Sequence, residues 1–331
     1  MKILITGAGG QDGILLIHHI LQNAPDTAIY GLSRDQKIFF SRLSAIGGDS
    51  LTNRFKEMGH FVTCDVNNRD KILSQLSLIQ PDVIFHLAAQ MEPLLQPGDE
   101  SQVLYKNMNG LIHILEACDQ LQIFPHIINA SSSLMFGKVN SGIASESTPF
   151  QPLTPYGLGK VVAHQFAHIF RTYKNQKVST AILFNHESTL RDERWLPMKV
   201  ISSSVRIKLG LQDKLKLGSV NSSRDWSSAK DIVSGLYAIM DHDAINQDFV
   251  FGSGTVMRVS ELLEIAFKRL DLSWRDYVEV EKSEGRSNDV LGFRADISKA
   301  KTEINWEPKI PTNEWVAEIQ DFCLEKTGRE L

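Results

Sequence analysis

The sequence predicts an α/β fold, built as a doubly wound parallel sheet with a smaller C-terminal lobe. Short apolar runs alternate with stretches of helical apolar spacing as far as about Asn185. These runs are continuously apolar, which indicates strands buried on both faces. Glycines follow the first run directly and open a helical stretch. Together these observations favour strand–turn–helix units arranged around a parallel sheet.

The elements follow in chain order. The predicted strands are Lys2–Thr6, Ala28–Leu32, Phe61–Val66, Val83–Ala88, His126–Ala130 and Ser179–Phe184. Helical spacing covers Gly13–Gln22, Gly110–Leu121 and Thr154–Tyr173. Thr154 suits the N-cap of the last helix and Pro155 its first turn. After Asn185 strands and helices no longer alternate regularly, and one helix is expected near Val200–Leu209. We therefore divide the chain into a sheet domain, residues 1–184, and a lobe, residues 185–331, interleaved with the sheet.

The composition of the 331-residue chain argues against several functional classes. Hydrophobic residues make up 42%, and the formal net charge of −4 gives no attraction to nucleic acid or to an anionic membrane. No apolar run approaches the ~20 residues of a membrane span, and no secretory leader is visible. Cys64, Cys118 and Cys323 lack metal-ligand spacing, so we expect free thiols in a reducing compartment and no metal. A cytoplasmic, soluble protein is expected.

A glycine-rich turn joins the first strand to the first helix. Gly7, Gly10 and Gly13 have the spacing G-x-x-G-x-x-G, and Gln11 and Asp12 lie within it. Glycine permits positive φ and lets backbone N–H groups approach a pyrophosphate, while the helix N-terminus adds partial positive charge. Between a strand and a helix this spacing predicts a Rossmann-type dinucleotide site.

The end of the second strand bears on which dinucleotide binds. NAD sites place an acid there for the ribose 2′-hydroxyl, whereas NADP sites use basic residues for the 2′-phosphate. Ser33 stands where the acid is expected, and Arg34 follows it. An arginine pairs well with phosphate, so NADP is favoured. Asp35 keeps NAD as the alternative. Asp65 and Val66, after the third strand, are expected to flank the adenine.

Tyr156 and Lys160 are four residues apart on the predicted helix, so they share a face. A lysine beside a tyrosine stabilises the phenolate, and we therefore expect a lowered phenol pKa and acid/base chemistry near neutral pH. The lysine also suits the nicotinamide ribose. Ser131, Ser132 and Ser133 supply hydroxyls at the carboxyl end of the fifth strand, where ligands bind in such sheets. Ser132 is the candidate that orients the reacting oxygen.

The motifs resemble those of the extended short-chain dehydrogenase/reductases, and within them the GDP-mannose 4,6-dehydratase branch. The resemblance covers nearly the whole chain. Its most specific pieces are Gly7–Gly13 (GAGGQDG), Leu87–Gln90 (LAAQ), Tyr156–Lys160, Ile182–Ser188 (ILFNHES), Val205–Gln212 (VRIKLGLQ), Arg224–Trp226 (RDW), Ala229–Asp231 (AKD), Ser298–Ala300 (SKA) and Asn305–Trp306 (NW).

The resemblance implies further roles. Ala88 joins the cofactor-binding residues. The GDP-sugar substrate would be held by Asn185, Arg191, Lys199, Arg224, Arg286 and Asp289. Cations there suit a diphosphate, which carries about two negative charges. The resemblance also implies a homo-oligomer, a dimer or a tetramer, with the Arg34–Ser41 loop near a neighbouring subunit's cofactor.

The chain departs from the family after the fifth strand. The family's Ser-Thr-Ser-Glu-Leu-Tyr-Gly is replaced by Ser131–Gly137 (SSSLMFG), so Leu134 stands where the family has a catalytic glutamate. That carboxylate removes the C5 proton and protonates the leaving 6-hydroxyl, and leucine can do neither. Loss of a general acid/base typically costs about 10²–10⁴-fold in rate. Glu92, in a loop that also departs from the family, is a candidate relocated carboxylate.

Three hypotheses follow. The first is an oxidoreductase that moves a hydride at C4 of a GDP-linked sugar through Tyr156, Lys160 and Ser132, as a dehydrogenase, 4-keto reductase or epimerase. The second is a 4,6-dehydratase with Glu92 as its acid/base. The third is a non-catalytic ligand-binding homologue. A carboxylate at the sugar pocket would favour the second hypothesis, and an occluded cofactor groove would favour the third.

Overall fold

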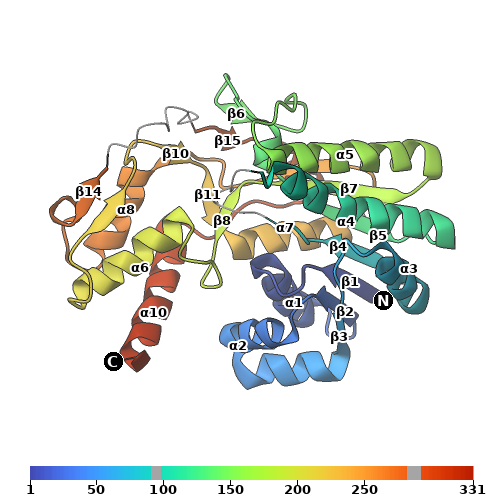
Figure 1. Ribbon diagram of the computed structural model, residues 1–331, viewed down its shortest axis with the longest axis horizontal. Helices are drawn as coiled ribbons and strands as arrows, with labels where there is room; N and C mark the ends of the chain where they lie inside the picture. The colour runs from blue at the N-terminus through green and yellow to red at the C-terminus, as the bar shows by residue number, and fades with distance from the viewer. Residues whose placement is uncertain (91–97, 282–291, 331) are drawn as a thin grey trace.

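A computed structural model describes residues 1–90, 98–281 and 292–330 of the chain. At its centre lies a seven-stranded sheet of order β12-β7-β5-β4-β1-β2-β3, with all neighbours parallel (Figure 1). The strands are β1 Lys2–Thr6, β2 Ala28–Ser33, β3 Gly59–Thr63, β4 Val83–His86, β5 His126–Ser132, β7 Lys177–Leu183 and β12 Asp248–Phe251. The predicted α/β doubly wound sheet is confirmed.

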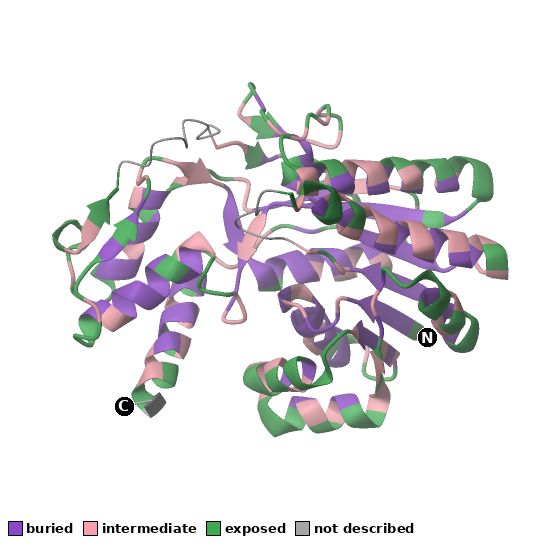
Figure 2. Ribbon diagram, in the orientation of Figure 1, coloured by how far each residue is buried: buried purple, intermediate pink, exposed green. Residues whose placement is uncertain are grey.

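Helices cover both faces of this sheet, which explains the continuously apolar strands. One face packs on α1 (Gln11–Asn23), α2 (Gln36–Met58) and α7 (Ala229–Asp241), and the other on α3 (Arg69–Ile79), α4 (Glu100–Leu121) and α5 (Pro155–Lys174). In β1, Ile3 and Ile5 enter the first core and Leu4 the second. Figure 2 shows the central strands almost wholly buried between the two helical layers.

The smaller lobe has a core of its own. Its helices α6 (Leu196–Lys208), α8 (Val259–Lys268) and α10 (Thr312–Glu330) pack together around Phe267 and Trp315. Short strand pairs complete it and link it to the sheet domain: β8 Asn185–Glu187 with β11 Trp226–Ser228, β9 Leu215–Leu217 with β14 Val278–Val280, β10 Ser223–Arg224 with β13 Met257–Arg258, and β6 Ile143–Ala144 with β15 Arg294–Ala295. The remaining short helices are η1 Ser133–Met135, η2 Trp274–Asp276 and α9 Ser298–Glu303.

The second half of the chain also contributes to the sheet. Strand β12 pairs with β7 at the sheet edge, and α7 packs against α1. Trp306, which follows α9, packs its ring edge-on against Phe251 of β12. The chain after Asn185 thus passes back and forth between lobe and sheet, and this ties the two parts together.

The structure corrects several element boundaries. Strand β3 is Gly59–Thr63 rather than 61–66, because α2 runs to Met58 and the strand starts at once at Gly59. The sequence did not predict α2 or α3. Helix α2 is interrupted by non-helical backbone at Gly47 and Gly48, which breaks its periodicity. Helix α5 begins as predicted, with the Thr154 hydroxyl accepting from the Gly157 N–H and Pro155 in the first turn.

No helix in the described part of the chain is long and apolar enough to cross a lipid bilayer. Cys64, Cys118 and Cys323 are all buried free thiols. Burial raises the pKa of the Cys118 thiol to about 12 and that of Cys323 to about 11, so both stay protonated at neutral pH. Within the described residues no cluster of His, Cys, Asp and Glu has the arrangement of a metal site.

Candidate active site

The carboxyl ends of the parallel strands meet along one edge of the sheet, where ligands bind in open α/β folds. Strand β5 divides this edge. On one side lie the ends of β4, β1, β2 and β3, and on the other those of β7 and β12. A pocket of about 480 Å³ opens on the first side and one of about 140 Å³ on the second. The residues at the end of β5 therefore stand between two pockets.

The glycine turn after β1 shapes the floor of the larger pocket. Gly7 has φ +70°, and a Cβ there would lie 2.7 Å from the backbone nitrogen of Ala88. A Cβ at Gly13 would lie 2.6 Å from the Gly7 carbonyl oxygen. Gly10 is the N-cap of α1 and supplies no side-chain cap, so N–H groups at this helix start remain available for an anion. The turn thus has the form that close backbone approach to a pyrophosphate requires.

Most of the predicted cofactor residues line this pocket. Gly7, Gly10, Arg34, Asp65, Val66 and Ala88 are among its walls. Gly13 instead packs tightly beneath the turn. The side chains of Gln11 and Asp12 bond to the segment around β8, with Gln11 accepting from the Ser188 hydroxyl at 2.8 Å. Their part in the site is to tie the glycine turn to that segment.

The larger pocket is richer in cations than the sequence indicated. Arg42, Lys106 and Arg194 line it together with Arg34. Arg42 donates to the Gly9 carbonyl at 2.8 Å, which fixes it beside the glycine turn. Arg42 lies four residues after Ile38 on α2, so the two residues share a helix face, and both line the pocket. This spacing would have pointed to Arg42 if α2 had been predicted.

Asp35, the residue that left NAD as the alternative cofactor, caps a helix. Its carboxylate is the N-cap of α2 and accepts from the Ile38 N–H at 2.9 Å. Ser33, at the end of β2, is the hydroxyl residue that precedes Arg34 in the pocket wall. The end of β2 therefore presents a hydroxyl and a guanidinium beside a carboxylate that is engaged in capping.

The predicted catalytic residues converge at the end of β5 and the start of α5. Ser132 is the last residue of β5, not the residue after it, and its hydroxyl hydrogen-bonds to the Tyr156 phenol. The Lys160 ammonium lies 5.9 Å from the centroid of the Tyr156 ring and donates to the Ala130 carbonyl at 2.8 Å. The spacing on the helix and the position after the strand thus bring these three side chains together.

The expected lowering of the phenol pKa is wrong for this structure. Burial raises the pKa of Tyr156 to about 12, although the Ser132 hydrogen bond and the Arg191 guanidinium oppose the rise. Burial also lowers the pKa of Lys160 to about 8. Removing both groups from water outweighs the charge attraction on which the expectation rested. The phenol is therefore protonated at neutral pH.

Leu134 lies immediately beside this group. It is part of η1, and its N–H donates to the Ser132 hydroxyl at 3.3 Å. Its side chain lines the smaller pocket, whose remaining walls are Gly137, Leu153, Thr154, Phe184, Asn185, Arg224, Asp225, Gly292 and Phe293. The one carboxylate among these described walls, Asp225, accepts hydrogen bonds from the N–H and hydroxyl of Ser253 and from the N–H groups of Gly254 and Ala295. Both of its oxygens are thus used within the protein.

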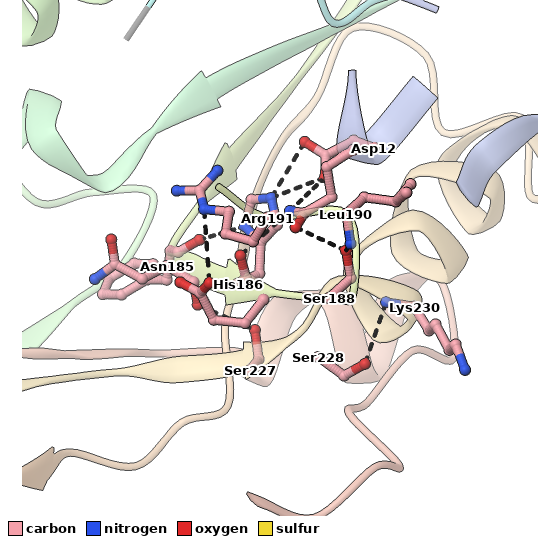
Figure 3. A network of polar contacts seen from close by, with 12 residues as sticks. Asp12, Asn185, His186, Ser188, Leu190, Arg191, Ser227, Ser228 and Lys230 are labelled. Carbon is pink, nitrogen blue, oxygen red and sulfur yellow. Dashed lines mark hydrogen bonds and ion pairs between the residues drawn. The ribbon is translucent and has the colours of Figure 1, made fainter. Parts of the chain in front are cut away.

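A buried network of charges joins the two sides of the site (Figure 3). His186 on β8 faces the Asp12 carboxylate at 3.0 Å through Nε2 and the Phe184 carbonyl at 2.7 Å through Nδ1. Both ring nitrogens face acceptors, so both carry protons and the ring is an imidazolium. Burial disfavours that charge, but Asp12 outweighs it and raises the pKa of His186. The pair fastens the start of α1 to β8.

Glu187 and Arg191 extend the network. Glu187 is 2% exposed, and its Oε2 lies 3.6 Å from the Arg191 Nε. Neither of these two atoms has a hydrogen-bond partner among the described residues. Burial raises the pKa of Glu187 to about 7, and the charges of Arg191 and His186 pull it back. The Arg191 guanidinium also stacks on Trp195 at 4.3 Å. The sequence predicted Arg191 as a site residue. It did not predict the pairing of Asp12 with His186 or the presence of Glu187 in the site.

The residues assigned to the sugar nucleotide are only partly brought together. Asn185 and Arg224 line the smaller pocket, and Arg191 lies in the adjoining network. Lys199 lines neither pocket, and its ammonium donates to the Lys216 carbonyl of β9 at 2.9 Å. Glu92, Arg286 and Asp289 lie outside the described residues.

Comparison with known proteins places this arrangement in a family. Residues 4–319 match the family model described as GDP-mannose 4,6 dehydratase. GDP-mannose 4,6 dehydratase 1 of Arabidopsis thaliana is 32% identical over 335 residues, covering 99% of this chain and 91% of the relative.

Solved structures share the fold. A dTDP-glucose 4,6-dehydratase from Bacillus anthracis in complex with NAD has a TM-score of 0.82 at 20% identity, covering 99% of this chain and 98% of that one. The RMD protein of Pseudomonas aeruginosa complexed with NADPH has a TM-score of 0.80 at 19% identity, covering 98% and 99%. The chain belongs to the GDP-mannose 4,6-dehydratase family.

Proposed function

We propose that the protein is an NADP-dependent oxidoreductase that moves a hydride at C4 of a GDP-linked sugar and stops short of eliminating water from C5 and C6. The observation that carries this proposal is Leu134, which lines the sugar-side pocket where the family has its glutamate. Asp225 is saturated by hydrogen bonds and cannot replace that glutamate.

The larger pocket fits a nicotinamide dinucleotide. The turn around Gly7 leaves no room for a Cβ, and the start of α1 offers free N–H groups to a pyrophosphate. Arg34 and Arg42 support NADP over NAD, since Asp35 is engaged as an N-cap. When bound, the cofactor would supply or accept the hydride. The open pocket also argues against the non-catalytic alternative.

Proton transfer is assigned to the phenol of Tyr156. Because its pKa is about 12, it holds a proton at neutral pH and can donate it to a C4 ketone oxygen as that carbon gains a hydride. Ser132 would orient the same oxygen. The Lys160 ammonium lies over the Tyr156 ring and places a positive charge beside the phenol. Asn185 and Arg224 would hold the diphosphate end.

The proposal is tested by incubating the protein with NADP and GDP-sugars. We expect net NADPH formation, seen at 340 nm, with a 4-keto sugar that retains its other substituents. A 4-keto-6-deoxy product formed from GDP-mannose with no net cofactor reduction would contradict the proposal.

A second candidate is the dehydration named in the descriptions of the relatives, at 26–32% identity. It requires an acid/base other than residue 134, and Glu92 is the residue the sequence offers. Glu92→Gln distinguishes the two functions, because it would abolish dehydration and leave hydride transfer at C4 nearly unchanged.

A further inference from the structure

Part of the wall of the smaller pocket is apolar. Leu134, Leu153, Phe184 and Phe293 contribute to it. Leu134 is 37% exposed and Leu153 is 67% exposed, although both are large aliphatic side chains in a chain with well-filled cores. Apolar side chains left open in a concave site commonly mark where a ligand's apolar surface is received.

Two polar residues of this pocket, Thr154 and Asp225, are already engaged within the protein. The Thr154 hydroxyl accepts from the Gly157 N–H at 3.0 Å as the cap of α5. Asp225 holds four donors, as described above. Asn185 and Arg224 supply the other, polar side of the pocket. The four apolar side chains of the described wall therefore offer a sugar hydroxyl no hydrogen-bonding group of their own.

The position of Leu134 relative to Tyr156 decides which part of a sugar it meets. Leu134 bonds through its N–H to Ser132, and its carbonyl packs so closely on α5 that a Cβ at Gly157 would lie 2.5 Å away. Leu134 thus lies beside Ser132 and the start of α5, and on the proposed function its side chain would meet an atom next to the reacting C4. In a hexopyranose the neighbours of C4 are C3, which carries a hydroxyl, and C5, which carries C6. In a hexose that keeps its C3 hydroxyl, the C5–C6 edge is the apolar neighbour when C6 is a methyl group.

We propose that the sugar processed here is a 6-deoxyhexose, with its C6 methyl group held against Leu134. This inference rests on the proposed function at C4. In the oxidative direction the C4–H bond breaks and its electron pair leaves as a hydride to NADP, while the C4 hydroxyl proton passes to solvent through Tyr156 and Ser132, giving the ketone, NADPH and H⁺. The reductive direction is the reverse, with the 6-deoxy-4-keto sugar as substrate.

The matching of methyl group to apolar wall predicts a definite selectivity. An apolar pocket rejects a ligand that adds one hydroxyl by up to about 100-fold. We therefore expect kcat/KM for a 6-deoxy sugar to exceed that for its 6-hydroxy counterpart by about 10- to 100-fold.

The test uses two matched pairs that differ only at C6. GDP-6-deoxy-D-mannose is compared with GDP-D-mannose, and GDP-L-fucose with GDP-L-galactose, each with NADP and the full-length protein. NADPH formation gives kcat/KM, and calorimetric titration of each sugar without cofactor gives Kd. In at least one pair the 6-deoxy member should be favoured in both measurements.

Two variants show whether Leu134 sets the selectivity. Leu134→Asn adds hydrogen-bonding groups at similar size and should shrink the 6-deoxy preference to within about threefold. Leu209→Asn is the matched control, because Leu209 is 40% exposed at the end of α6 and lines neither pocket. It should keep the preference of the unchanged protein.

Three outcomes overturn the inference in different ways. Equal or better use of both 6-hydroxy sugars rejects the methyl site and leaves C4 chemistry in place. An unchanged preference in a folded Leu134→Asn protein rejects the role of Leu134. Failure to oxidise any of the four sugars rejects the proposed function itself, and the inference with it.

Discussion

The two sides of the sheet edge differ in the residues that line their pockets. On the side of β1, β2 and β4, arginines and backbone N–H groups suit the negative charge of a phosphate. The backbone of Ala88 lies so close to Gly7 that no side chain fits there. On the side of β7 and β12, two leucines and two phenylalanines line the smaller pocket together with polar residues such as Asn185 and Arg224. On the proposed function, the contrast teaches that the cofactor side keeps its form while an apolar side chain, Leu134, takes the place of an acid/base on the sugar side. Between the two sides stands Tyr156.

The largest expected effect tests the residue that both sides share. Tyr156→Phe removes the proton donor and keeps the ring, so turnover should fall by about 10²–10⁴-fold. Cofactor affinity, measured by NADPH fluorescence, should stay within about twofold because the phenyl ring still fills its place. Retained turnover would remove Tyr156 from the chemistry.

The next test challenges the cofactor side alone. Gly7→Ala and Gly210→Ala both force a side chain onto positive φ, at +70° and +71°, but only the first places a Cβ against neighbouring backbone. Such strain costs about 1–3 kcal/mol. We expect both variants to lose stability, while only Gly7→Ala weakens NADPH binding, by about 100-fold or more.

Thermal unfolding of the same two proteins separates stability from binding. If Gly210→Ala weakened NADPH binding as much as Gly7→Ala, the close approach at Ala88 would not be what shapes the pocket.

A smaller effect should distinguish the two dinucleotides. Arg34→Ser removes a guanidinium that suits the 2′-phosphate, and hydrogen bonds to charged groups contribute about 1.5–3 kcal/mol. NADP affinity should therefore fall by about 10- to 100-fold with NAD affinity nearly unchanged. Lys37→Ser, at an exposed position on α2 outside the pocket, serves as the control. Equal losses for both dinucleotides would contradict the assignment of NADP.

The smallest effect concerns the Asp12–His186 pair that joins the two sides. The pKa of His186 is raised, so its contribution to stability is complete below about pH 6.5 and is lost as pH rises through the raised value. The pKa of Asp12 is lowered because the attraction of His186 outweighs burial, so its contribution is present above about pH 4 and is lost as pH falls through the lowered value. The pair should stabilise most between these limits.

We expect His186→Gln to lower Tm by a few degrees near pH 5.5 and by progressively less toward pH 9. Differential scanning calorimetry across this range measures it. A difference that grew with pH would show that the ring is neutral in the native protein.

The sequence was informative wherever chemistry depends on local spacing. The turn from Gly7 to Gly13, the start of α5 at Thr154 and Pro155, and the four-residue step from Tyr156 to Lys160 are fixed by neighbours in the chain. The structure has the glycine turn, the helix start and the shared helix face where the sequence predicted them. Each of these features is defined by a single turn of helix or the end of a single strand.

Features that depend on distant segments were not predictable in this way. The pairing of Asp12 with His186 joins residues 174 positions apart, and β12 joins the sheet long after the alternation of strands and helices has ended. Arg42 reaches the cofactor pocket from a helix whose pattern Gly47 and Gly48 interrupt. The direction of the Tyr156 pKa shift depends on burial, which a pair of residues on a helix does not reveal.

The proposed function requires above all that no proton is removed from C5 of the sugar. GDP-D-mannose and NADP are incubated with the protein in D₂O, and the products are followed by NMR and mass spectrometry as NADPH appears. We predict an oxidised sugar that keeps hydrogen at C5 and oxygen at C6. A 6-deoxy-4-keto sugar carrying deuterium at C5 would show that elimination occurs despite Leu134 and would contradict the account.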